Sequence, residues 1–222
     1  MANYVIDPRI LEKYLPHKTE IDTWNGTCYV SLIGFMFLNT RLKGIKIPFH
    51  SNFEEVNLRF YVRYLDQGSW KRGVVFIKEI VPKPALTFVA NTLYKEHYET
   101  LPMRHTWDFT EDQLSLDYQW KKGKWHSFKM MTGPVSALIE ENSEEEFITE
   151  HYWGYTRLSA ESTSEYGVQH PKWEVYQTKS YEIDVDFGQV YGPDFAFLSQ
   201  EKPVSVFLAE GSEIKVMEGR KL

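Results

Sequence analysis

Three things are scarce in this sequence of 222 residues: cysteine, long apolar runs, and basic charge in excess of acidic charge. The single cysteine, Cys28, excludes an internal disulfide, and its apolar surroundings favour a small buried side chain over a nucleophile. No apolar run approaches the roughly 20 residues that a membrane helix needs. The first residues lack the basic stretch followed by an apolar stretch that is typical of a signal peptide. The formal net charge of −6 argues against a general nucleic-acid binder, which would present a basic stripe. We therefore expect a cytoplasmic protein that contacts neither nucleic acid nor membrane.

Motifs for metals, phosphates and covalent catalysis are missing too. The seven histidines show no metal-ligand spacing, and one cysteine cannot build a zinc site. Neither a G-x-S-x-G motif nor a glycine-rich phosphate loop occurs. We therefore expect no metal and no cofactor.

The sequence is rich in residues that form strands, since aromatic residues make up 16% of it. Apolar spacing and turn residues predict short helices at 7–14, 85–94 and 144–150. They predict strands in a hairpin over 19–37 that turns at Asn25–Gly26, and then at 55–64, 71–81, 101–109, 113–120, 125–131, 151–158, 173–187, 204–208 and 213–217, the last two joined at Gly211–Ser212. The stretch 159–164 is expected to be a polar loop. About ten strands without a βαβ rhythm predict a single domain, 1–222, built as an antiparallel sandwich or barrel.

The strand expected at 55–64 has one polar and one apolar side, because alternate side chains of a strand face opposite ways. The polar side carries Glu55, Asn57, Arg59, Tyr61 and Arg63. The apolar side carries Val56, Leu58, Phe60, Val62 and Tyr64. The apolar side must face the core, while alternation leaves open whether the polar side faces water or an enclosed site. A guanidinium with a carboxylate and an amide nearby suits a small carboxylate or carbonyl ligand.

The segment 49–63, FHSNFEEVNLRFYVR, resembles the hallmark segment of the YqjF-like family of uncharacterised bacterial proteins. The stretches WNG at 24–26, YVSL at 29–32, RGVVF at 72–76 and YG at 191–192 are similar to that family as well. The family is similar in fold to acetoacetate decarboxylase. The resemblance implies a closed antiparallel β-barrel or cone with a few short peripheral helices and a central cavity, into which the polar side of 55–63 points.

The same resemblance argues against the decarboxylase reaction. Acetoacetate decarboxylase works through a lysine imine, and its lysine follows a proline. The counterpart here is Pro102-Met103-Arg104, where a thioether would occupy the nucleophile position and Arg104 stays protonated. Lys78 interrupts an apolar strand and is the other candidate for an imine, although a lysine at a strand end more often reaches solvent. Decarboxylation of acetoacetate is therefore not expected.

Two functions from different classes stay open, and a purely structural role is a weaker third. In the first, a polar central cavity binds a small anionic or carbonyl metabolite, a carboxylate being one candidate. In the second, the chain is a lyase- or hydratase-type enzyme in which Glu55 is the acid or base, since it matches a cavity glutamate of the decarboxylase. The candidate ligand-binding residues are Asn57, Arg59, Tyr61, Arg104, His105 and His126. The two histidines are also open to a plain hydrogen-bonded or surface role, and a homo-oligomer is left open.

Overall fold

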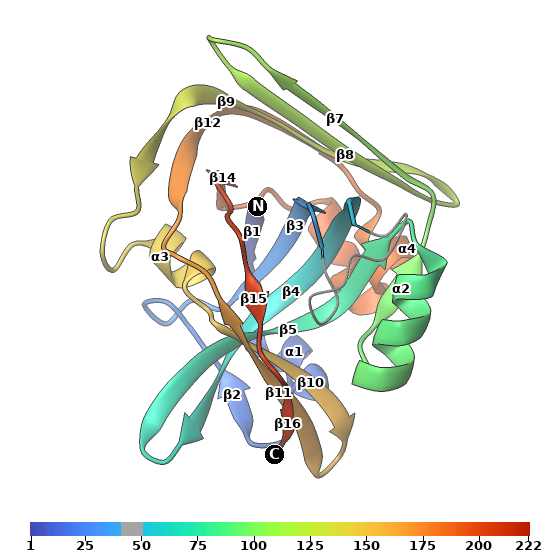
Figure 1. Cartoon of the computed structure of the whole chain (residues 1–222), viewed down its shortest axis with the longest axis vertical. Helices are drawn as coiled ribbons and strands as arrows, with labels where there is room; N and C mark the ends of the chain where they lie inside the picture. The colour runs from blue at the N-terminus through green and yellow to red at the C-terminus, as the bar shows by residue number, and fades with distance from the viewer. Residues whose placement is uncertain (41–50) are drawn as a thin grey trace.

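The computed structural model describes residues 1–40 and 51–222, which form two β-sheets and short helices (Figure 1). Within these residues the larger sheet has eleven strands and the smaller has five. The main path of the larger sheet runs β13 (Ser205–Val206), β1 (Ala2–Val5), β3 (Tyr29–Phe37), β4 (Phe53–Asp66), β5 (Ser69–Val81), β10 (Trp153–Ser159), β11 (Ser162–Gln169) and β15 (Lys215–Val216). Off this path, β2 (Thr19–Ile21) pairs with β4, β6 (Tyr98–Thr100) with β5, and β16 (Arg220–Lys221) with β11. The smaller sheet runs β14 (Leu208–Ala209), β12 (Glu174–Asp184), β9 (Lys124–Leu138), β8 (Leu114–Lys122) and β7 (Met103–Phe109).

The helical segments are short. They are α1 (Pro8–Leu11), η1 (Glu12–Tyr14), α2 (Pro84–Val89), η2 (Ala90–Tyr94), α3 (Glu144–Thr149), α4 (Phe187–Tyr191) and η3 (Pro193–Ser199). The predicted helix starts are confirmed at two caps. The Asp7 side chain accepts a hydrogen bond from the Arg9 amide at 3.0 Å, and the Ser143 hydroxyl accepts one from the Glu146 amide at 3.1 Å.

The main core lies between the two sheets. The even-numbered side chains of β4 from Val56 to Val62 are completely buried there, together with Tyr118 and Trp120 of β8 and Phe128 of β9. The odd-numbered face of β4 packs elsewhere, since Tyr61 belongs to a second apolar cluster under α3. The odd face is therefore covered at Glu55, Asn57 and Tyr61, and it becomes exposed to solvent only toward Arg63.

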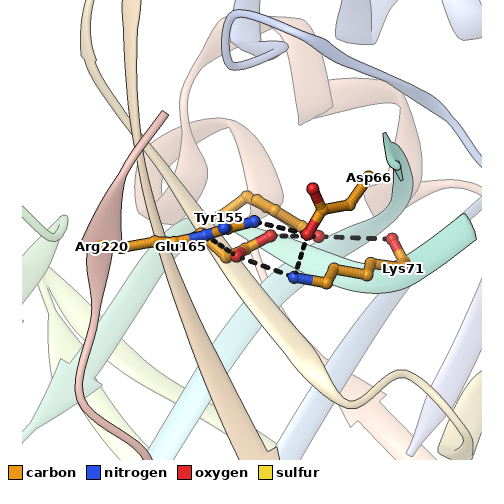
Figure 2. A network of polar contacts seen from close by, with 5 residues as sticks. All are labelled: Asp66, Lys71, Tyr155, Glu165 and Arg220. Atoms are coloured by element: carbon orange, nitrogen blue, oxygen red, sulfur yellow. Dashed lines mark hydrogen bonds and ion pairs between the residues drawn. The ribbon is translucent and has the colours of Figure 1, made fainter. Parts of the chain in front are cut away.

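A polar network ties the C-terminal strand β16 to the turn between β4 and β5 (Figure 2). Arg220 donates from Nε to Oε1 of Glu165 and from Nη2 to Oδ2 of Asp66, at 2.6 Å in each case. The Lys71 ammonium lies 2.6 Å from Oδ2 of Asp66 and 3.2 Å from Oε1 of Glu165. The Tyr155 hydroxyl donates to Oε2 of Glu165 at 3.2 Å. Glu165 is only 1% exposed, so its charge is compensated almost entirely by these donors.

The mainly β fold expected from the sequence is confirmed. The described strands pair as two sheets, and closure into a barrel stays a prediction. Asn25 and Gly26 do form a tight turn with φ values of 49° and 80°, but β2 pairs with β4 and not with β3 as predicted. The loop predicted at 159–164 is wrong in extent, because the turn occupies only 160–161 and β11 begins at Ser162.

Two other pairings also differ from the prediction. The arms expected as a hairpin at Gly211–Ser212 separate, since β14 pairs with β12 and β15 with β11. The larger sheet is not purely antiparallel, because β5 pairs in parallel with both β6 and β10. Strand partners are chosen by long-range packing, which local alternation does not encode.

Candidate functional site

The strand β4 carries the centre of the candidate site on its odd-numbered face. Glu55 and Asn57 are each 1% exposed. Asn57 Nδ2 donates to Glu55 Oε1 at 2.9 Å, and the Tyr98 hydroxyl of β6 donates to Glu55 Oε2 at 3.2 Å. The alternation of β4 therefore places a carboxyl group and an amide on one buried face, where the phenol of Tyr98 joins them from β6.

Two further carboxyl groups join Glu55 because of the sheet register. Glu79 of β5 lies opposite Asn57 of β4, and Tyr98 of β6 lies opposite Glu79. Glu96 precedes β6 and accepts a hydrogen bond at 2.7 Å from the hydroxyl of Thr156, a buried residue of β10. We call Glu55, Glu79, Glu96 and Tyr98 the carboxyl cluster.

Burial changes the protonation of the carboxyl cluster. It raises the pKa of Glu55 from 4.5 to about 7, with a further rise from the charge of Glu96 and an opposing effect of Arg59. Burial also raises the pKa of Glu96 to about 7. The pKa of Glu79 lies well above its usual value, because the group is buried and faces Glu55 and Glu96. These shifts favour the neutral form of Glu79, and they place Glu55 close to its titration midpoint near pH 7.

Several polar atoms beside the carboxyl cluster have no hydrogen-bond partner in the described part of the chain. They are Oδ1 of Asn57, Nε of Arg59 and Oε2 of Glu79, all buried. The Arg59 guanidinium makes one long hydrogen bond, from Nη2 to the Ile148 carbonyl at 3.4 Å. Buried polar atoms are almost always paired, and an unpaired guanidinium nitrogen is costly. These three atoms offer one donor and acceptors for a small polar molecule.

Tyr61 lies on the same face but is committed to the fold. Its hydroxyl shares a 2.7 Å hydrogen bond with Oγ of Ser31, and its ring packs at 5.3 Å from that of Phe147 and 4.8 Å from that of His151. The Arg59 guanidinium lies 5.7 Å from the Tyr61 ring centroid. Tyr61 therefore supports Arg59 rather than extending the carboxyl cluster.

The structure does not bring the other three predicted site residues to the carboxyl cluster. Arg104 and His105 are on β7 in the smaller sheet, and His105 lies 3.6 Å from Glu54, on the side of β4 opposite to Glu55. His126 of β9 is buried in the main core beside Trp120. Its Nδ1 accepts from the Asp186 amide at 3.3 Å, so its Nε2 carries the proton and donates to the Lys122 carbonyl at 3.1 Å.

Lys78 also faces away from the carboxyl cluster. It lies opposite Leu58, on the core side of the sheet. Its ammonium donates to the Val190 carbonyl at 2.6 Å and lies 2.8 Å from Oε2 of Glu99. Burial lowers the pKa of Lys78, yet these partners hold the amine away from Glu55.

The residues that sequence reasoning missed are Glu79, Glu96 and Tyr98. Glu79 had a signal, because it is an acidic residue inside the apolar run 74–81. The same run drew attention to Lys78, one position earlier and on the opposite face. Glu96 and Tyr98 had no local signal, since only the parallel pairing of β6 with β5 brings them to Glu55.

Two negative findings apply to the described residues alone. In residues 1–40 and 51–222, no group of three or more His, Cys, Asp or Glu side chains is placed to hold a metal ion. No helix in the same residues has the length and apolar character needed to cross a membrane.

Comparison with known proteins identifies the family. The profile of DUF2071, described as an uncharacterized conserved protein, matches residues 1–213. The chain belongs to the DUF2071 family. A relative of this DUF2071 chain is the uncharacterized protein YqjF of Bacillus subtilis (strain 168), 28% identical over 188 residues, which cover 83% of this chain and 74% of YqjF.

Solved structures similar to the DUF2071 chain have low sequence identity, so they show the fold alone. The enduracididine biosynthesis enzyme MppR, complexed with pyruvate, matches with a TM-score of 0.65 at 11% identity, over 99% of this chain and 86% of MppR. Acetoacetate decarboxylase from Legionella pneumophila matches with a TM-score of 0.53 at 13% identity, over 82% of this chain and 69% of the decarboxylase. The predicted resemblance to the YqjF-like family and to the acetoacetate decarboxylase fold is therefore confirmed.

Proposed function

We propose that the chain binds a small anionic or carbonyl metabolite, a 2-oxo acid such as pyruvate being the first candidate, at the carboxyl cluster. The observation that carries the proposal is the buried Arg59 Nε without a partner among the described residues, beside the free Oδ1 of Asn57. A guanidinium is the side chain best suited to a small carboxylate. The closed barrel and central cavity expected from the sequence are part of this proposal. The structural neighbour MppR, whose structures hold pyruvate and a condensation product of pyruvate, supports the ligand class.

The raised pKa values of the carboxyl cluster favour binding of a carboxylate ligand. Three ionised carboxylates would repel an anion, but burial raises the pKa of all three. A neutral Glu79 can donate a hydrogen bond to a ligand oxygen. The site therefore combines one fixed cation with carboxyl groups whose raised pKa values reduce their negative charge at neutral pH.

The proposal predicts that removing the Arg59 guanidinium weakens pyruvate binding. In Arg59→Met the affinity should fall by about 2 kcal/mol, roughly 30-fold in Kd, because a charge-assisted hydrogen bond is lost. Isothermal titration with pyruvate measures this change. The matched control is Arg63→Met on the same strand, since Arg63 is half exposed and donates from Nε to Glu20 at 2.6 Å. No saturable binding by the unmodified chain, or equal weakening in both variants, would contradict the proposal.

A second candidate function is acid–base catalysis by Glu55, of the lyase or hydratase type. It is favoured by the pKa of about 7, which suits a group that takes and returns protons near neutral pH. Lys78 faces away from Glu55, so this reaction would proceed without an imine on that lysine.

Solvent exchange separates the enzyme from the binder. In D₂O, an enzyme that removes a proton next to the pyruvate carbonyl should speed deuterium incorporation into the methyl group, seen by NMR. Glu55→Gln should abolish this acceleration while leaving the fold intact. If the unmodified chain binds pyruvate but gives only the buffer rate, binding without turnover is the function.

A further inference from the structure

Among residues 1–40 and 51–222, no strand covers the outer edge of β7 in the smaller sheet, and this feature is independent of the carboxyl cluster. β7 pairs with β8 on one side and is the last strand in the sheet order (Figure 1). From Arg104 to Phe109 every residue of β7 is exposed. Its register with β8 contains no bulge, and the strand has no proline. Natural edge strands usually carry such features to prevent pairing, so β7 is available to another strand.

The backbone of β7 has a fixed orientation at this edge. At one end the Lys121 amide donates to the Pro102 carbonyl at 2.9 Å, and at the other the Thr110 amide donates to the Gln113 carbonyl at 2.9 Å. Even-numbered residues therefore direct their N–H and C=O groups to β8, because bonding groups alternate along a strand. The N–H and C=O groups of His105 and Trp107 point to the free edge.

The charges on β7 lack ionic partners in the described residues. The Arg104 guanidinium donates from Nε to the neutral amide of Gln119 at 2.6 Å and lies 4.3 Å from the Trp125 ring centroid. Asp108 has no hydrogen bond or ion pair in the described part of the chain. The two residues share one face but lie about 13 Å apart, so they cannot pair within one chain.

We propose that two copies of this chain form a two-fold symmetric dimer by antiparallel pairing of their β7 strands, centred on Thr106. In this register, and in no other centred on β7, each Arg104 lies opposite Asp108 of the second copy. His105 then lies opposite Trp107, and these are the residues whose backbone groups point outward. The exposed aromatic face, in which the rings of Trp107 and Phe109 stack at 5.5 Å, continues across the two copies. The smaller sheets join into one.

A charge-reversal series in sedimentation velocity, run over a concentration range, tests the dimer. The unmodified chain should be dimeric. Arg104→Asp and Asp108→Arg should each raise the dimer Kd by about 30-fold or more, because each places two like-charged pairs across the two-fold axis. The double variant, which carries both substitutions, should restore dimerisation, since the opposite charges then face each other again. The matched control Lys121→Asp, an exposed residue of the neighbouring strand, should leave the dimer unchanged.

A backbone variant tests the strand pairing itself. His105→Pro removes an N–H that points to the free edge and leaves the ladder to β8 intact, so it should give a folded monomer by circular dichroism. A monomeric unmodified chain would overturn the proposal. So would a dimer that resists both single reversals and His105→Pro. Because none of these residues touches the carboxyl cluster, pyruvate binding reports separately on the proposed function.

Discussion

At the residue scale, Glu55 links the fold to the proposed chemistry. The folded carboxyl has a pKa of about 7 against an ordinary value of 4.5, because it is buried. Between these two values the folded chain binds a proton that the unfolded chain has released. The stability that Glu55 contributes is therefore complete below pH 4.5 and is lost as the pH rises through 7. Glu96 acts in the same direction.

We predict that the free energy of unfolding falls between pH 5 and pH 8, with each of these carboxyl groups accounting for up to about 3 kcal/mol. Glu55→Gln should flatten this fall, because an amide stays neutral throughout. Urea unfolding at both pH values measures it. Glu54→Gln, on the opposite face of the same strand, should keep the full pH dependence. An equal slope in Glu55→Gln and the unmodified chain would contradict the burial argument.

His151 works in the opposite sense, at the lower end of the pH range. It is buried, and burial lowers its pKa to about 4 despite the hydrogen bond to Asp22. The stability that neutral His151 contributes is present in full above pH 6.5 and is lost as the pH falls through 4. The chain is therefore limited by buried carboxyl groups on the alkaline side and by this buried imidazole on the acid side.

At the scale of the element, the two-residue strand β16 is too short to be held by its ladder alone. It pairs with β11, and its Arg220 joins Glu165 of that strand to Asp66 at the β4–β5 turn (Figure 2). The nearly complete burial of Glu165 makes this arginine important, because an uncompensated buried carboxylate is costly.

Arg220→Ala should lower the free energy of unfolding by about 2 kcal/mol, less than a fully broken buried ion pair because Lys71 and Tyr155 still contact Glu165. Chemical denaturation measures the loss. Lys221→Ala, the exposed neighbour on the same strand, should change stability by less than about 0.5 kcal/mol. Equal effects in the two variants would show that the network does not stabilise β16.

At the scale of the whole molecule, the parallel contact between β5 and β10 joins the two halves of the larger sheet. Gly73 of β5 lies opposite Trp153 of β10. A Cβ at position 73 would lie 2.5 Å from the Trp153 carbonyl oxygen and 2.6 Å from the Tyr155 ring. Only glycine permits this approach of the two backbones.

Gly73→Ala should therefore destabilise the chain by about 3 kcal/mol, because the backbone of β10 must shift. Thermal unfolding measures the change. Gly133→Ala in β9 is the control, since the nearest atom to its new methyl group would be Lys179 Cε at an ordinary 3.7 Å. If the melting temperature falls no more than in the control, the close approach of β5 and β10 at Gly73 is not needed for stability.

The sequence by itself determined the local features. Alternation along β4 identified its apolar and polar faces. Helices begin near the predicted positions 7 and 144, and β7, β8 and β9 overlap the strands predicted at 101–109, 113–120 and 125–131. The quoted motifs also gave the family and the type of fold. These features depend on neighbours a few residues apart, where propensity and periodicity act.

Only the tertiary structure decided which segments meet. Burial and contacts between segments far apart in the chain decide three features that local patterns did not predict. They are the pairing of β2 with β4, the parallel pairing of β5 with β6 and β10, and the formation of β11. The same register brings Glu79 and Glu96 to Glu55, and it leaves Arg104, His105 and His126 with the other sheet. The alternation of side chains along a strand predicts that Glu55 and Arg59 share a face, but it does not predict what that face packs against.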